Sequence, residues 1–246
     1  MRLAPLVLVT LLVSYLGGCC FGGPWPDGMV HRYSRSADGR TELSGVAYPP
    51  QGEYIRGDGV PRTEQRALDA FDHIDCSGDI DLVVSIGDGA AAAEVTADSN
   101  LVEHIETRVE GNRLRVQMRE GSYVVSTRPT VRVTAPVLLA IESQGGGRVA
   151  VTGVRGEAFS AHAMGSGDVS LSGLAEHLDL ELMGSGDIDA RGLAARDVRL
   201  EALGSGEIQV HVSRALTGRM TGSGDLVVIG EPTVRAVEML GSGRIR

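Results

Sequence analysis

The stretch MGSGDIDARGL, residues 183–193, carries the feature that decides the fold. Related stretches begin at Met164, Leu203, Thr221 and Leu240, so the chain contains five Gly-Ser-Gly triplets. The triplets start at residues 165, 184, 204, 222 and 241, with steps of 18 to 20 residues. A period of about 20 residues that contains strand patterns is typical of a solenoid, in which the chain winds once per repeat.

Each repeat holds two predicted strands in which aliphatic and polar side chains alternate. Successive side chains of a strand point to opposite faces, so the aliphatic residues are predicted to point inward and the polar residues to water. The predicted inward residues before the triplets are Phe159, Leu178, Val198, Leu216, Ala161, Leu180, Leu200, Ala163, Leu182, Ala202, Met220 and Met239. Those after the triplets are Val169, Ile188, Ile208, Leu226, Ile245, Leu171, Ala190, Val210 and Val228. The predicted outward residues are Asp179, Glu181, Asp189, Glu201 and Gln209.

The triplets are predicted to be the corners at which each coil reverses direction. Glycine accepts positive φ, which a residue with a Cβ atom resists. Serine between two glycines can bond its hydroxyl to local backbone, and the acidic residue that follows can accept backbone N–H groups. The predicted corner residues are Gly165, Ser166, Gly167, Gly184, Ser185, Gly186, Gly204, Ser205, Gly206, Gly222, Ser223, Gly224, Gly241, Ser242 and Gly243.

Residues 71–135 alternate in the same way but without the fixed period. The segments around Ile80, AEVTAD and TVRVTAP read as strands, and IETRVEG faces NRLRVQMR across Gly111-Asn112. The AAAAE run at Ala90 is too short to form a helix alone. The predicted fold is therefore an all-β, single-chain β-helix-like solenoid over residues 69–246, with coils of about 19 residues and the irregular coils first.

The first residues read as a targeting segment. Leu3 to Leu16 is an apolar run of 14 residues, shorter than the roughly 20 that span a bilayer as a helix. The run closes on Leu-Gly-Gly-Cys, which looks like a bacterial lipobox with Cys19 as the acylated residue. We therefore expect a lipoprotein signal peptide over residues 1–18, with an ordinary signal peptide as the alternative. Cys20 in place of an aspartate resembles lipoproteins sorted to the outer membrane.

Residues 19–68 are predicted to be a flexible tether, because they are rich in Pro, Gly and Ser and show no sustained period. The formal net charge is −9, and all 23 basic residues are arginine. An acidic chain without a basic stripe is a poor nucleic-acid binder, so that class is set aside. Cys76 lies in a strand pattern and is predicted to be a buried thiol. No disulfide, zinc spacing or cofactor is predicted.

Four acidic residues follow the triplets, namely Asp168, Asp187, Glu207 and Asp225. Stacked coils would place these carboxylates in a ladder that Arg244 ends. Such a ladder could bind Ca²⁺ through several oxygens, but neither the period nor the placement of the acids matches the nonapeptide Ca²⁺-binding repeat. A solvated acidic edge is the favoured interpretation.

Catalytic motifs are weak. The six histidines are scattered, and Met164 stands where a Gly-x-Ser-x-Gly motif around Ser166 needs glycine. Asp187 and Asp189 have the spacing that puts two carboxylates on one strand face, so a polysaccharide-cleaving enzyme stays an alternative. Acidic pairs are common on any solvated strand, and a non-enzyme is predicted.

Three phrases together with the GSGD corners resemble the GIN-domain family, described as an autotransporter adhesin head domain. The phrases are FDHIDCSGDIDLVVSIGD, EVTADSNLVEHIETRVEGNRLRVQMR and RPTVRVTAPVLLAIESQGGG. The likeness covers about residues 70–246, and Asp79-Ile80-Asp81 stands where the family has Gly-Ile-Asn. The resemblance implies a β-helix-like fold in a secreted or lipid-anchored bacterial envelope protein, and it supplies no catalytic residue.

The expected function is that of a non-enzymatic, lipid-anchored envelope protein that presents a stacked β surface for adhesion or for building the envelope. The expected partners are a membrane, through acylated Cys19, and a cell-surface glycan or protein. The last residues, Gly243 to Arg246, are expected to leave an open strand edge, through which an end-to-end dimer could form. A carbohydrate-active enzyme and a Ca²⁺-stabilised structural protein are the alternatives.

Overall fold

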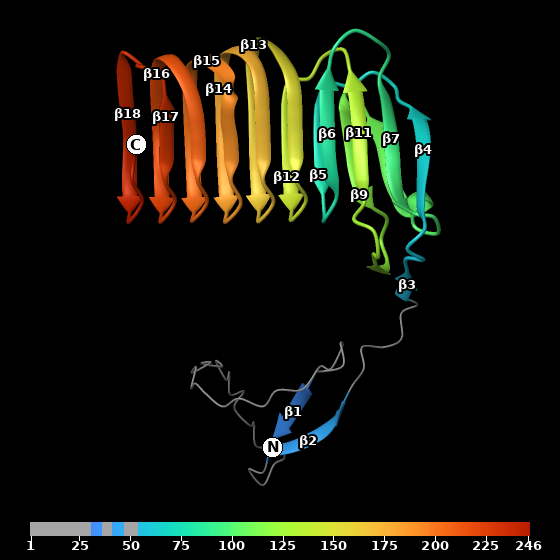
Figure 1. Ribbon diagram of the computed structural model, residues 1–246. Helices are drawn as coiled ribbons and strands as arrows, with labels where there is room; N and C mark the ends of the chain where they lie inside the picture. The colour runs from blue at the N-terminus through green and yellow to red at the C-terminus, as the bar shows by residue number, and fades with distance from the viewer. Residues whose placement is uncertain (1–30, 36–40, 47–53) are drawn as a thin grey trace, which may run out of the picture. The chain divides into compact units, whose positions relative to one another are not determined.

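The computed structural model describes residues 31–35, 41–46 and 54–246 (Figure 1). The chain divides into two compact units, Met1–Gln51 and Gly52–Arg246. Strands β1 (His31–Arg35) and β2 (Thr41–Val46) of the first unit pair antiparallel. The predicted signal peptide and Cys19 lie outside the described residues. No helix in the described part of the chain is long and apolar enough to cross a membrane.

The second unit contains the predicted solenoid. Its coils are built by parallel strands, and equivalent residues of successive repeats pair directly, as Ile188 does with Val169 and Ile208. Gly184 pairs in the same way with Gly165 and Gly204, so the corners lie over one another. The all-β solenoid predicted from the period of about 20 residues is confirmed. Its strands are β13 (Val149–Gly165), β14 (Val169–Gly184), β15 (Ile188–Gly204), β16 (Ile208–Gly222), β17 (Leu226–Ile229) and β18 (Val234–Gly241).

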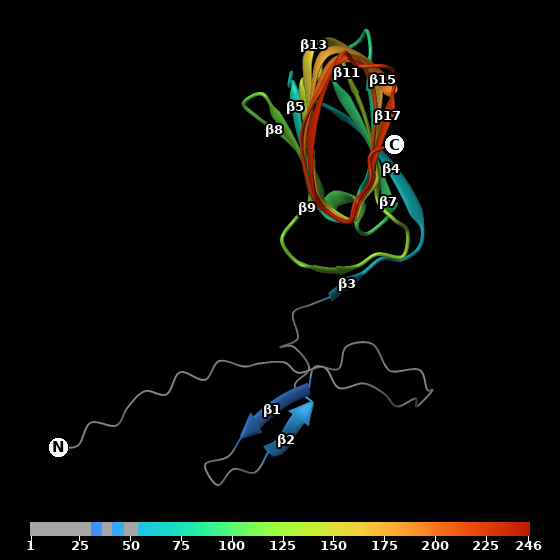
Figure 2. The ribbon, with the colours of Figure 1, turned by 90° about the vertical axis from the view of Figure 1, so that its left-hand side faces the viewer.

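Each coil is flattened into two walls, which form the long sides of the oval in Figure 2. The first half of β13 pairs with β6 and its second half with β12, so one long strand serves both walls. Wall A contains the strand halves that precede the triplets, and wall B contains the halves that follow them. Wall A continues through β18, β12 (Ala140–Gly145), β5 (His73–Ser77), β9 (Arg113–Met118) and β8 (Ile105–Glu110). Wall B continues through β17, β6 (Asp81–Ile86), β11 (Thr130–Ala135), β7 (Ala92–Asp98) and β4 (Pro61–Ala67).

The first coils are irregular because a long insertion separates them. Strands β5 and β6 meet at Gly78-Asp79 and form the first coil, and β12 and β13 form the next. The insertion contains β7, a short 3-10 helix η1 (Val102–His104), the predicted β8–β9 hairpin, β10 (Ser122–Val124) and β11. It extends both walls, since β9 pairs with β5 in wall A and β11 pairs with β6 in wall B.

The folded unit starts earlier in the chain than the predicted boundary at residue 69. Strand β3 (Tyr54–Arg56) pairs with β10, and β4 pairs antiparallel with β7 over its whole length. Both strands lie in the stretch that was expected to be a tether. Strand β4 is the outermost strand of wall B and is largely exposed, so it shows no aliphatic alternation by which the sequence could identify it.

The core runs between the two walls. Nearly all the residues that were predicted to point inward are buried, and Ile188, Leu200 and Ile208 are completely so. The exceptions are Ala202, Val228, Met239 and Ile245, which are half-buried. Three of these four lie at the C-terminal end of the solenoid, where β18 pairs with β16 alone among the described residues and only the short segment 244–246 lies beyond β17. Of the predicted outward residues, Asp179 and Glu201 are exposed, and Glu181, Asp189 and Gln209 are half-exposed.

Asp98, the last residue of β7, is a buried carboxylate that fastens the segment between β10 and β11 to this strand of wall B. It accepts hydrogen bonds from the backbone N–H of Ser126, at 2.8 Å, and of Thr127, at 3.1 Å. Burial by itself raises the pKa of this carboxyl, but these hydrogen bonds outweigh burial and hold the pKa below its usual 3.8. A lowered pKa in the folded state gives stability that is present above the unfolded value and is lost as the pH falls through the folded value.

We therefore expect Asp98→Asn to lower the Tm clearly at pH 7, because its amide hydrogens face N–H donors. The difference in Tm from the parent should shrink as the pH falls from about 4, where the carboxyl of the unfolded chain takes up a proton, through the lower pKa of the folded state. Asp88→Asn, on an exposed turn, is the matched control and should leave the Tm unchanged. A difference in Tm for Asp98→Asn that stays constant between pH 7 and pH 2 would contradict this account.

Candidate functional site

The two glycines of each corner are required for different reasons. At Gly204 the φ angle is +143°, and a Cβ atom would lie 1.9 Å from the carbonyl oxygen of Gly184. Gly206 has no positive φ, yet a Cβ atom there would lie 1.8 Å from the carbonyl oxygen of Gly186. The expectation that positive φ explains the corner glycines thus holds for the first glycine only. The second glycine, at the third position of the triplet, is needed because the backbone of the neighbouring coil approaches too closely for a side chain.

The corner serines act through their backbone and not through the expected hydroxyl bond. The N–H of Ser185 donates to the carbonyl oxygen of Gly165 in the preceding coil, at 2.9 Å. Ser205, Ser223 and Ser242 make the same contact with their preceding coils, each at 3.0 Å. The side chains of all five corner serines are exposed. A short polar residue therefore suits this position without any chemical role for its hydroxyl.

The acidic residues after the triplets link one coil to the next. Asp168 accepts a hydrogen bond from the backbone N–H of Asp187 at 3.2 Å, and Asp187 accepts one from Glu207 at 2.7 Å. Asp225 accepts the N–H of Arg244 at 2.9 Å. Glu207, which is one methylene longer, instead accepts the side-chain amide of Gln209. The carboxylates of Asp168, Asp187 and Asp225 are thus engaged in holding adjacent coils.

No group of three or more His, Cys, Asp and Glu side chains suited to a metal ion occurs in the described ranges. The acidic ladder of Asp168, Asp187, Glu207 and Asp225 is thus not such a group. We expect addition of a chelator such as EGTA to leave the Tm of the full chain unchanged, because backbone N–H groups already bind these carboxylates. A fall of more than a few degrees, reversed by Ca²⁺, would restore the Ca²⁺-stabilised alternative.

The carboxylate pair considered for polysaccharide cleavage is also engaged elsewhere. Asp189 forms an ion pair with Arg191, with oxygen–nitrogen distances of 2.7 and 2.9 Å. The Arg191 guanidinium outweighs desolvation and lowers the pKa of Asp189. A general acid for glycoside hydrolysis needs a raised pKa. Asp189 is therefore not suited to the role of the general acid.

Cys76 lies in the core beneath wall A, where it is a free thiol with 3% of its surface exposed. Burial raises its pKa to about 12. The thiol is therefore protonated at neutral pH and acts as a small apolar side chain, as the strand pattern indicated.

The outer face of wall A is the part of the molecule best suited to hold a ligand. Its column of side chains nearest the corners is Met164, Met183, Leu203, Thr221 and Leu240. Leu203 is 58% exposed, and Met183 and Leu240 are also exposed. The next column is charged and consists of His162, Glu181, Glu201, Arg219 and Glu238. An exposed apolar row beside a polar row is typical of a binding surface.

Two hollows adjoin on this face and share Arg199 and Thr217 in their linings. One, of about 580 Å³, lies over the apolar and charged columns. The other, of about 750 Å³, has small residues in its lining, which leave space between the larger charged groups. The small residues are Ala140, Ala158, Ser160 and Ala215, and the larger groups include His73, His177, Asp179 and Asp197. Together the hollows offer apolar contact and hydrogen-bonding groups to one elongated ligand.

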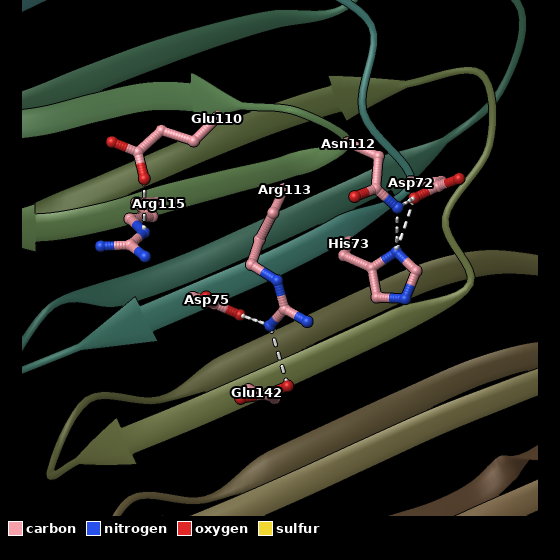
Figure 3. A network of polar contacts seen from close by, with 8 residues as sticks. All are labelled: Asp72, His73, Asp75, Glu110, Asn112, Arg113, Arg115 and Glu142. Carbon is pink, nitrogen blue, oxygen red and sulfur yellow. Dashed lines mark hydrogen bonds and ion pairs between the residues drawn. The ribbon is translucent and has the colours of Figure 1, made fainter.

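A network of polar contacts borders the second hollow, at the β5–β9 part of wall A (Figure 3). Arg113 contacts both Asp75 and Glu142, the latter at 2.9 Å, and so joins three neighbouring strands. His73 lies 2.5 Å from a carboxylate oxygen of Asp72, which also accepts the side-chain amide of Asn112. Sequence reasoning missed this network, because its contacts join residues up to 40 positions apart, as between Asp72 and Asn112, through sheet pairing alone. The network fixes the orientation of His73 at the edge of the hollow.

Comparison with known proteins agrees with this architecture. The family model described as "Putative auto-transporter adhesin, head GIN domain" matches residues 70–232. The chain belongs to the GIN-domain family. No curated protein matches it. Among solved structures, a "putative adhesin" from Bacteroides fragilis NCTC 9343 has a TM-score of 0.66 and 22% identity, over 78% of this chain and 98% of that chain. A "putative lipid binding protein" from Parabacteroides distasonis ATCC 8503 has a TM-score of 0.53 and 23% identity, over 78% and 98%.

The GIN domain of this chain keeps its first corner although Asp79-Ile80-Asp81 departs from Gly-Ile-Asn. Asp79 accepts the backbone N–H of Gly146 at 3.0 Å, and Asp81 accepts that of Arg148 at 2.9 Å. An asparagine side chain offers the same kind of acceptor oxygen. The departure therefore leaves the link between the first two coils of the GIN domain intact.

Proposed function

We propose that this protein is a non-enzymatic adhesion module of the bacterial cell envelope, which binds a cell-surface glycan or protein on the outer face of wall A. The observation that carries the proposal is the pair of adjoining hollows on the outer face of a wall whose inner face packs against the core. Membership of the GIN-domain family supports an adhesin-like role. A stacked sheet is a rigid support, so little ordering of the protein would oppose binding.

The proposal includes a lipid anchor on Cys19 and a place in the outer membrane. The support is the Leu-Gly-Gly-Cys sequence after an apolar run and the absence of aspartate after Cys19. Labelling growing cells with an alkyne fatty acid tests the anchor, and Cys19→Ser should abolish the label and release the chain from the membrane fraction. Equal labelling of both chains would remove the anchor and leave the binding proposal intact.

Binding is tested on an array of glycans and peptidoglycan fragments with the full chain in detergent. Thr217→Arg places a guanidinium at the border of the two hollows and should reduce the bound signal at least tenfold. Ser170→Arg makes a comparable change at an exposed position of wall B and should bind like the parent. Equal loss in both variants would reject wall A as the binding face, and a blank array would reject the glycan ligand in favour of a protein.

A further inference from the structure

We propose that the β18 end of the solenoid is a self-association surface, where two copies pair antiparallel through β18 and form a closed two-fold dimer. Strand β18 pairs with β16 on one side, and its other side has no strand among the described residues. An open strand edge with free N–H and C=O groups is a template for another strand. The proposal is independent of the ligand suggested for wall A.

The two ends of the solenoid differ. At the β4 end, Arg66 crosses from wall B and donates to the carbonyl oxygens of Ile105, at 2.6 Å, and Val102, at 2.8 Å. Leu101 and Val102 beneath this bridge are completely buried. This end is therefore closed by side chains, and a head-to-tail contact would have to displace them.

At the β18 end the core is open. Val228, Val237, Met239 and Ile245 occupy inner positions but are only half-buried. The side chains at the equivalent positions one coil earlier are covered, since Val210 and Leu226 are completely buried and Met220 is 3% exposed. The equivalent of Val237 is Gly218. This end thus presents inner apolar surface that one more layer would bury, and pairing of like ends across a two-fold axis would bury it in both copies.

The sequence of β18 is self-complementary about Val237. Antiparallel pairing centred there sets Val234 opposite Leu240 of the second copy, and Arg235 opposite its Met239. Val234 and Leu240 are 49% and 47% exposed in one chain, so their contact would bury apolar surface on the outer side. Glu238 lies opposite Ala236 and keeps its ion pair with Arg219 at 2.9 Å. No two like charges stand directly opposite each other in this register.

Arg235 explains why association would stop at two copies. It occupies the inner column that Phe159, Leu178, Val198 and Leu216 fill with apolar side chains, yet Arg235 is exposed. A further coil stacked in parallel would bury its charge against an aliphatic residue. In the antiparallel dimer its aliphatic stem can lie along Met239 of the second copy while the guanidinium reaches the rim.

The test is cysteine cross-linking of the full chain in the membranes of cells that express it. In the proposed dimer the two copies of residue 237 face each other, so Val237→Cys should form a reducible dimer in more than half of the chains after mild oxidation. Thr217→Cys lies one strand further in on wall A and should stay at the parent's level. The parent carries the same Cys19, Cys20 and Cys76 and sets the baseline.

The register has its own control. Residues 234 and 240 are six positions apart, about 20 Å along a strand, so neither Val234→Cys nor Leu240→Cys should cross-link alone. The double variant should cross-link strongly. Sedimentation in detergent should give a dimer for the parent and a monomer for Val237→Arg, and circular dichroism should show that the variant keeps its β structure. Baseline cross-linking of Val237→Cys, or a monomeric parent, would overturn the proposal.

Discussion

Replacing Gly206 by alanine is expected to destabilise the protein by about 4 kcal/mol or more, or to prevent folding. The added Cβ atom would lie 1.8 Å from the carbonyl oxygen of Gly186 and 2.9 Å from Cδ2 of Leu182. The oxygen belongs to the backbone of the neighbouring coil, so relief requires the two coils to move apart. Such a movement would also weaken the hydrogen bond from Glu207 to Asp187 at the same corner. Urea denaturation of the full chain, followed by circular dichroism, measures the change.

Two controls separate this effect from an ordinary loss of glycine. Gly87→Ala makes the same chemical change on an exposed turn, where no heavy atom lies within 4 Å of the new Cβ atom, and should change stability by less than about 0.5 kcal/mol. Ser205→Ala leaves the backbone N–H that bonds Gly184 and should be equally mild. If Gly206→Ala were as mild as these two, the close approach of the coils at the corners would be wrong.

The second large effect is expected in the core. Leu200 is completely buried between Leu180 and Gly218 in its column, so Leu200→Ala should cost about 3 kcal/mol. Gly218 has no side chain that could move into the space. A larger residue does not fit there, because a Cβ atom at position 218 would lie 1.9 Å from the carbonyl oxygen of Leu200. The cavity should therefore persist, so the cost includes the cavity as well as the lost burial of the removed atoms. The midpoint of urea denaturation should fall without a change in slope.

Leu203→Ala is the matched control, since it removes the same atoms three residues along the same strand. Leu203 is 58% exposed on the outer face of wall A, so the change should cost less than about 0.5 kcal/mol. Equal destabilisation by the two substitutions would contradict the assignment of Leu200 to the inner face of β15 and of Leu203 to the outer face. The control also removes part of the apolar column, so it reports on ligand binding in the same preparation.

Much of the solenoid could be predicted from the sequence, because each coil repeats one local pattern of alternating aliphatic residues and a Gly-Ser-Gly triplet. The aliphatic positions around Ile188 and Ile208 recur at a period of 20 residues, and a strand has a side-chain period of two. These two periods fix which face is buried and which residues stack. The β8–β9 hairpin could be predicted for the same reason, since alternation on both sides of Gly111-Asn112 specifies a local antiparallel pair.

Strands β3 and β4 could not be predicted, because their pairing partners lie far along the chain and most residues of β4 are exposed. Pro61 pairs with Asp98, and Tyr54 pairs with Ser122. The same holds for the Arg66 bridge to Ile105 and for the contacts of Arg113 with Asp75 and Glu142. Sequence periodicity predicts contacts within a strand, across a short turn or between repeats, and none of these contacts is of those kinds.

The sequence by itself determined that the chain winds into stacked coils with Gly-Ser-Gly corners, because a local repeat constrains every coil in the same way. The tertiary structure alone decided why the second glycine of each Gly-Ser-Gly corner is required, which carboxylates bind backbone N–H groups, and where wall A is hollow. It also distinguished the closed β4 end from the open β18 end. These features depend on distances between coils, and such distances follow from packing in three dimensions and not from the order of residues along one coil.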